Sequence, residues 1–300
     1  MMRFLVLTAL IAFGGAVAAY QAPQQPPPIV GTAAQLEVVK LKDNFFVITS
    51  SNPTPRETFS GGNVTVLITD AGVTLVDTKL ANWGQALLDK LKTITPKPVT
   101  TIINTHTHGD HTGNDDKFGK VEIIAHENTK ANMAKMPAFA GDKGQFLPGK
   151  TFATTMNIGS GRDAIQLHYF GRGHTNGDAV LIFPGHRIAQ MGDLFAWKDA
   201  PRCDTNNGGS CVEYPKTLAA AAAALKNIDT VIPGHSPMMK VADVQEYARF
   251  LADMVSSAQA AKKAGKAVAD AAKAFSVAKY PGYKTENVAA AMQIIYDETK

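Results

Sequence analysis

Residues 105–113 read Thr-His-Thr-His-Gly-Asp-His-Thr-Gly and place three imidazoles and one carboxylate within six positions: His106, His108, Asp110 and His111. Imidazole and carboxylate are the usual ligands of Zn²⁺ and its neighbours, and a catalytic site needs several of them on a short turn. The preceding residues 99–104 are apolar and β-branched, which predicts a buried strand ending at the cluster. Alternate residues of an extended chain point the same way, so His106 and His108 suit one ion. Asp110 and His111 fall in the following turn and suit a second ion.

Three further candidate ligands lie downstream, and each follows a strand-like run and a glycine or turn. His174 comes after residues 165–170, Asp193 ends the run 188–192, and His235 follows Val231. With all three in order, a metal site is a stronger interpretation than a coincidental polar loop. If the strand ends meet at one rim of a sheet, one ion is held by His106, His108 and His174. The other is held by Asp110, His111 and His235, with Asp193 able to bridge both.

This ligand series resembles that of the metallo-β-lactamase superfamily of binuclear hydrolases, from about Gly62 to about Ser236. The resemblance implies an α/β fold, an αβ/βα four-layer sandwich of two mixed sheets with helices outside. Asp77, at the end of Val-Thr-Leu-Val-Asp, is similar to the family's acid near the first metal. We expect Asp77 to orient a ligating histidine and not to bind an ion, because ligating histidines need partners for their other ring nitrogen.

Asp193 distinguishes branches of that family, because some β-lactamases have a cysteine ligand at this position. Members with aspartate, such as glyoxalase II, lactonases and phosphodiesterases, use it to bridge the ions. A hard carboxylate tolerates iron or manganese better than a thiolate does, so the resemblance implies two Zn²⁺ ions with Fe or Mn as alternatives. The lysine that grips the substrate carboxylate in cysteine-type enzymes is Ala196 here, whereas Asn206 matches their oxyanion-contacting asparagine loosely.

The chemistry implied is hydrolysis by a metal-bridging hydroxide, since two divalent ions lower the pKa of a shared water from ~15.7 toward ~7. Asp110 would be the catalytic residue, binding the second ion and orienting the nucleophile or relaying its proton. Phe195 and Trp197 offer an apolar wall, and residues 50–62 join two strands near the expected site as a flap. We therefore expect a small ester, lactone, thioester or lactam as substrate.

Two other functions remain open. A true β-lactamase is favoured by the export signal described below and the loop at Asn206, and opposed by the missing cysteine and lysine. A metal-binding accessory protein without hydrolytic turnover would need the same ligands but no substrate.

The N-terminus predicts export. Residues 1–19 combine one arginine, an apolar stretch and small residues near Ala19, as in a cleavable signal peptide, and are short for the ~20 apolar residues of a membrane span. We expect no stable membrane insertion after cleavage, and a periplasmic or secreted protein. Residues 20–35 form a Pro/Gln-rich linker. Residues 36–300 form one hydrolase domain with an alanine-rich, helical C-terminal extension on the outside of the sandwich.

Charge and cysteine content narrow the partners and the redox state. The formal charge of +4 is too small and too dispersed to indicate nucleic acid binding, so the expected partner is a small molecule. Cys203 and Cys211 lie in one loop, and in an exported protein they predict a disulfide. The alternatives are two free thiols or a further metal ligand.

Overall fold

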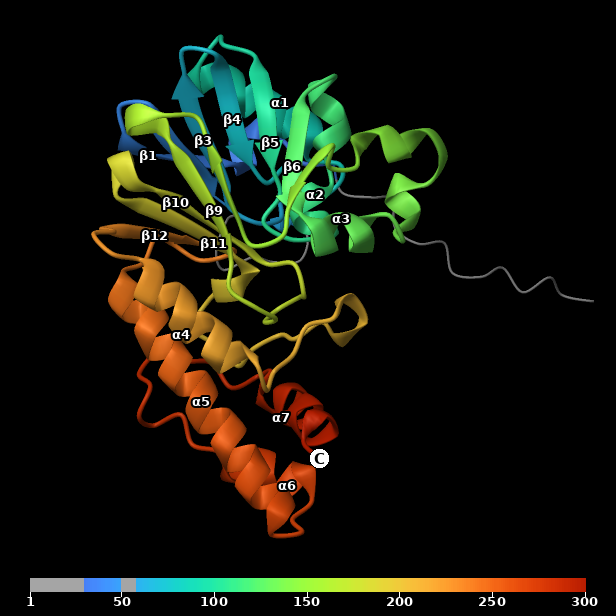
Figure 1. The fold of residues 1–300 in the computed structure, drawn as a ribbon, viewed down its shortest axis with the longest axis vertical. Helices are drawn as coiled ribbons and strands as arrows, with labels where there is room; N and C mark the ends of the chain where they lie inside the picture. The colour runs from blue at the N-terminus through green and yellow to red at the C-terminus, as the bar shows by residue number, and fades with distance from the viewer. Residues whose placement is uncertain (1–29, 50–57) are drawn as a thin grey trace, which may run out of the picture.

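Two mixed β-sheets pack face to face in the computed structural model, which describes residues 30–49 and 58–300 (Figure 1). The first sheet has the order β1-β2-β3-β4-β5-β6-β7, antiparallel as far as β4 and parallel beyond it: β1 (Glu37–Lys42), β2 (Phe45–Thr49), β3 (Val64–Thr69), β4 (Gly72–Val76), β5 (Val99–Ile103), β6 (Glu122–His126) and β7 (Lys150–Phe152). The second has the order β12-β11-β10-β9-β8, parallel only between β11 and β12: β8 (Thr155–Ile158), β9 (Ile165–Tyr169), β10 (Ala179–Phe183), β11 (Ile188–Gly192) and β12 (Thr230–Pro233).

Strand alternation explains why each sheet buries both faces. In β3, Leu67 packs between the two sheets, whereas Val66 packs under the outer helix layer. In β10, Leu181 faces the other sheet and Val180 faces the helices on the opposite side. Because successive side chains of a strand point to opposite faces, near-continuous apolar runs are what a doubly covered sheet requires.

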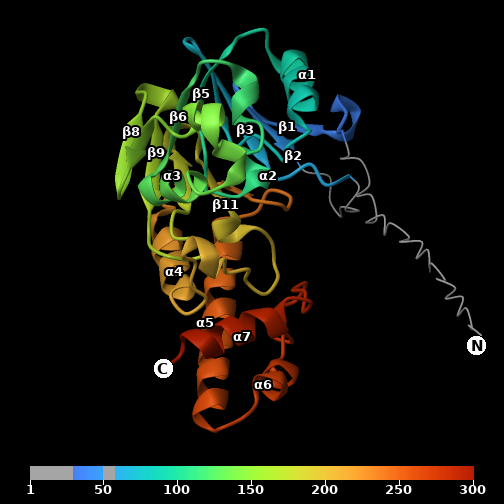
Figure 2. The same cartoon turned by 90° about the vertical axis from the view of Figure 1, so that its right-hand side faces the viewer.

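Helices cover both outer faces and complete the four layers. α1 (Gly84–Ile94) covers the first sheet through Leu87, and α4 (Tyr214–Ala224) and α5 (Val241–Lys263) cover the second. The remaining helices are α2 (Gly109–Thr112), α3 (Glu127–Met133), α6 (Val268–Ala274) and α7 (Val288–Glu298). α6 and α7 pack on α5, and Figure 2 shows α7 crossing it. The predicted four-layer α/β sandwich is confirmed.

The chain meets the domain before Leu36, the predicted boundary. Gly31 is buried against the Trp83 ring and donates its backbone N–H to Asn82 O at 3.3 Å. Residues 30–35 are therefore part of the packed structure and are not an extended tether. The predicted signal peptide, residues 20–29 of the linker and residues 50–57 of the predicted flap lie outside the described residues. Within 30–49 and 58–300, none of the helices has the length and apolar character that a membrane crossing requires.

Candidate metal centre

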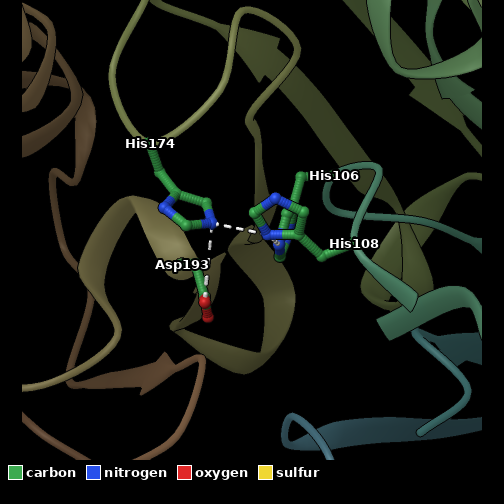
Figure 3. A group of neighbouring side chains, drawn as sticks. All are labelled: His106, His108, His174 and Asp193. Atoms are coloured by element: carbon green, nitrogen blue, oxygen red, sulfur yellow. Dashed lines mark hydrogen bonds and ion pairs between the residues drawn. The ribbon is translucent and has the colours of Figure 1, made fainter. Parts of the chain in front are cut away.

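The predicted ligands converge at the rim where β5, β11 and β12 end. One group contains His106, His108, His174 and Asp193, and a second contains Asp110, His111 and His235. Within each group, one ligand atom per residue lies within 4.8 Å of the others. Figure 3 shows the three imidazoles of the first group and Asp193 directed toward a common point. The structure therefore brings all seven side chains together, in the two sets expected from the sequence.

The first group presents ring nitrogens to one another. His108 Nδ1 lies 3.2 Å from His106 Nε2 and 2.9 Å from His174 Nε2. The outer nitrogens are held from behind: His108 Nε2 by Asp204 Oδ2 at 2.7 Å, and His174 Nδ1 by Arg202 O at 2.6 Å. A carbonyl oxygen and a carboxylate only accept, so these outer nitrogens carry the protons and the inner ones present lone pairs.

His106 is held by a two-step relay. Its Nδ1 lies 3.0 Å from Thr105 Oγ1, and that hydroxyl donates to Asp77 Oδ2 at 2.8 Å. The Thr105 hydrogen is thus committed to Asp77, which leaves the hydroxyl oxygen to accept from His106. The third inner nitrogen of the group is therefore a lone pair as well.

Asp77 also serves the second group. Its Oδ2 lies 2.7 Å from His111 Nδ1, and its Oδ1 accepts from Thr105 N at 2.8 Å. Asp77 is fully buried with φ of 66°, a left-handed conformation that is strained for a residue other than glycine. The structure places Asp77 behind the ligands, where it orients two histidine rings.

The second group meets the first at Asp193. His111 Nε2 lies 3.2 Å from His235 Nε2, and Asp193 Oδ1 lies 3.3 and 3.2 Å from these two nitrogens. Asp193 Oδ2 lies 3.7 Å from His174 Nε2 of the first group. Asp110 Oδ2 lies 3.3 Å from His235 Nε2. Asp193 thus offers one oxygen to each group.

These donors fit a pair of divalent cations. Tetrahedral ligands at about 2.0–2.1 Å from a zinc ion stand about 3.3 Å apart, close to the nitrogen separations of 2.9–3.2 Å in the first group. Three inward lone pairs without a proton between them repel one another unless a cation lies at their centre. His106, His108 and His174 would hold one ion, and Asp110, His111 and His235 the other, with Asp193 between them.

The electrostatics of the two groups differ. Burial lowers the pKa of His106 well below its ordinary value and that of His174 to about 4, so both imidazoles are neutral ligands at pH 7. Burial acts in the same direction on His111, but Asp193, Asp77 and Asp110 together raise its pKa well above the ordinary value. The carboxylates of the second group therefore favour a positive charge at His111, either as a proton or as a metal ion. A metal ion that binds there would displace the proton.

A cavity of about 410 Å³ opens onto the centre. Its walls include Phe59, Trp197 and Arg202, and the Arg202 guanidinium lies 5.0 Å from the centre of the Trp197 ring. Phe59 and Trp197 flank His235, with ring centres 5.4 and 5.2 Å away. Trp197 thus lies where an apolar substrate wall was expected.

Two predicted substrate-binding residues lie elsewhere. Phe195 is buried in the helix-side core with its ring 5.2 Å from Tyr247, because a 3₁₀ turn over Asp193–Phe195 rotates it away from the cavity. Asn206 is exposed on a short 3₁₀ helix (Thr205–Asn207) and is not among the described residues lining the cavity.

Sequence reasoning missed Asp204, Arg202 and α7. Asp204 accepts the His108 ring from a loop that the Cys203–Cys211 disulfide closes, as predicted for the cysteine pair. No spacing marks an acid 96 residues after its histidine as a partner. The signal in the sequence is Cys203, which lies between Arg202 and Asp204 and whose predicted disulfide fixes this loop. His126 and His186 bond to Ala153 O and Asn44 Oδ1, outside both groups.

Comparison with known proteins agrees with this geometry. The sequence model described as the Metallo-beta-lactamase superfamily matches residues 58–235. "Metallo-beta-lactamase type 2" of Elizabethkingia meningoseptica is 25% identical over 269 residues, covering 86% of this chain and 94% of that one. "Metallo-beta-lactamase domain-containing protein 1" of Xenopus laevis is 31% identical over 188 residues, covering 60% and 70%.

Solved structures share the fold. A metallo-beta-lactamase from Pontibacter korlensis has a TM-score of 0.61 at 23% identity and covers 72% of this chain and 98% of that one. The mono-zinc form of FIM-1 from Pseudomonas aeruginosa has a TM-score of 0.59 at 17% identity, covering 76% and 98%. The family match ends at His235, so α5, α6 and α7 lie beyond it.

Proposed function

Because the chain belongs to the metallo-β-lactamase superfamily of metal-dependent hydrolases, we propose that it is an exported dinuclear hydrolase of a small ester, lactone, thioester or lactam. Zinc is the expected metal, with iron or manganese as alternatives. The observation that carries the proposal is Asp193, whose two oxygens reach a ligand group each. A carboxylate shared in this way would help to hold an ion in each group beside one cavity.

Divalent ions held by these two groups would supply Lewis acidity, which lowers the pKa of a water molecule and polarises a carbonyl oxygen. The chain's own residues set the direction of attack. Asp110 lines the cavity, and although burial opposes its ionisation, His111 and His235 hold its pKa at about 2. It is therefore a carboxylate at neutral pH and accepts a hydrogen bond from the attacking water, which fixes the orientation of that water. Phe59 and Trp197, whose ring centres lie 5.4 and 5.2 Å from that of His235, give the cavity apolar surface beside the centre.

A β-lactamase is the second candidate. It is supported by the relative from Elizabethkingia meningoseptica, named a metallo-beta-lactamase and similar over 86% of this chain. Two residues weigh against it: Asp193 in place of cysteine, and Ala196 in place of the lysine that grips the substrate carboxylate. A lactam is therefore one of several substrate classes to be tested.

The proposed location is the periplasm or the exterior of the cell. Residues 1–19 have the composition of a cleavable signal peptide, and the Cys203–Cys211 disulfide suits an oxidising compartment. Fractionation of cells expressing the full chain, with mass measurement of the mature N-terminus, tests this. A full-length product retained in the cytoplasm would contradict it.

A substrate panel tests the proposed reaction. The purified, zinc-loaded protein is offered nitrocefin, an acyl-homoserine lactone, a lactoyl thioester and an aryl ester. We expect zinc-dependent turnover of at least one, lost in Asp110→Ala and in His174→Ala. His168→Ala is the matched control, because His168 lies in β9 outside both ligand groups. Silence on every compound with both metals bound would overturn the proposal and favour a non-hydrolytic accessory protein.

A further inference from the structure

The C-terminal helix α7 forms a wall of the same cavity as the metal centre. Asn287, Ala290, Ala291 and Ile294 line it together with His108, Asp110, His174 and Asp193. α7 lies more than 50 residues beyond the last predicted ligand and outside the region that the family model matches. The helical extension, which the sequence predicts on the outside of the sandwich, therefore also lines the cavity of the metal centre.

Both ends of α7 are fixed to the loop that supports the first ligand group. At its start, Asn287 Nδ2 donates to Asp199 Oδ2 at 2.7 Å. At its end, one carboxylate oxygen of Glu298 accepts from Ser210 Oγ and from Val212 N, each at 2.9 Å. Lys262 of α5 donates to Tyr296 O at 2.6 Å. Because four hydrogen bonds hold it, α7 is a fixed wall.

The wall is apolar. Ala290, Ala291 and Ile294 line the cavity, as do Phe59, Trp197 and Pro201. The Asn287 amide nitrogen is already bonded to Asp199. Among the described residues lining the cavity, Arg202 carries the one fixed positive charge, and it lies over the Trp197 ring. The cavity therefore combines the polar ligands of the metal centre with apolar side chains that α7 supplies.

We propose that α7 binds the apolar arm, an acyl or alkyl chain, of the compound whose hydrolysable group lies at the metal centre. This inference rests on the proposed function and adds the substrate class to it: an amphipathic acyl compound. The cavity of about 410 Å³ lies within the ~300–1,000 Å³ typical of small-molecule sites. The small side chains of Ala290 and Ala291 leave the room that the chain needs.

A homologous series of acyl thioesters with two, four and eight carbons tests the proposal on the zinc-loaded protein. We expect kcat/KM to rise about fourfold per added methylene until the wall is covered, because each methylene leaves water for apolar surface. Ala290→Phe should lower kcat/KM at least tenfold for the eight-carbon substrate and at most threefold for the two-carbon one. Ile294→Ala should move the optimum to a longer chain.

Gln293→Phe is the matched control, since Gln293 is exposed on the same helix and does not line the cavity. It should keep the wild-type chain-length profile. A profile that is flat in the wild type, or equally altered by Ala290→Phe and Gln293→Phe, would overturn the inference.

A binding measurement separates this inference from the proposed function. Octanoate and butyrate are titrated calorimetrically into the zinc-free protein, where Arg202 is available to the carboxylate. We expect octanoate to bind at least tenfold more tightly than butyrate. Ala290→Phe, which fills the space beside Ala290, should abolish the difference. If no compound of the substrate panel is hydrolysed but this difference in affinity appears, the proposed function fails and the binding of an apolar arm to α7 stands. Equal affinities would overturn the binding to α7 and leave the proposed function in place.

Discussion

At the scale of single residues, the centre depends on what stands behind the ligands. His106, His108 and His174 each have an outer nitrogen held by an oxygen of Thr105, Asp204 or Arg202. The sequence motif predicts that the rings of His106 and His108 converge, because alternate positions after a strand point in the same direction. It does not predict their partners, which come from other loops. Lys79 is a second example: burial, opposed by Asp77 and Asp110, lowers its pKa to about 7, yet nothing in its sequence neighbourhood marks it as buried.

Asp204 provides the first prediction. Asp204→Ala removes the acceptor of His108 and should weaken binding of the first ion about 10- to 100-fold, with the second ion unaffected. Asp204→Asn should lose less, since an amide oxygen still accepts from the ring and still caps the helix Thr205–Asn207. Competition with a chromophoric chelator measures both affinities. Asn206→Ala, in the same loop, is the control; a similar loss in it would point to general disturbance of the loop.

Asp115 provides a prediction about pH. Burial raises its pKa to about 8, and the hydrogen bonds from Thr78 and Asn104 offset only part of this. A raised folded-state pKa means that the stabilising contribution is complete below the ordinary value of 3.8 and is lost as the pH rises through about 8. Relative to Asp115→Asn, the wild type should lose a few kcal/mol in its free energy of unfolding between pH 5 and pH 9. Urea unfolding at each pH measures this, and parallel curves for the two proteins would contradict it.

At the scale of elements, what local pattern predicts and what it misses can be separated. The strand over 99–104 and the strand ends that carry His174, Asp193 and His235 are found as expected, because apolar runs and turn residues are local signals. Phe195 was misplaced because the extended chain gives way to a 3₁₀ turn at Asp193, where side chains no longer alternate. The loop 193–214 is then held by the Cys203–Cys211 disulfide and by hydrogen bonds such as that between Asp204 and His108. Periodicity does not encode these contacts.

The disulfide gives the prediction for this element. Replacing Cys203 and Cys211 together by serine should lower the free energy of unfolding by about 2–3 kcal/mol, the chain-entropy cost of opening so short a loop. It should also weaken binding of the first ion, because Arg202 and Asp204 flank Cys203 and hold His174 and His108. Denaturant unfolding with and without reductant measures the first effect. If reductant destabilises the double variant as much as the wild type, the bond is not the cause.

At the scale of the whole molecule, the centre depends on segments far apart in sequence. The alanine-rich periodicity after Val241 predicts helices, and α5, α6 and α7 are there. It does not predict that the chain returns to the cavity, because that return rests on contacts such as Asn287 with Asp199, 88 residues apart. Sequence reasoning reached the four-layer fold and the ligand set through a motif and strand ends. The sequence does not predict that α7 lines the cavity, because tertiary packing determines the position of this helix.

The metal content of the intact chain tests the account most directly. Native mass spectrometry of the zinc-loaded protein should find two ions per chain, falling to one in His174→Ala and to one in His111→Ala, since each histidine belongs to a different ligand group. One ion or none in the wild type, or two in both variants, would contradict a dinuclear centre built from these seven side chains.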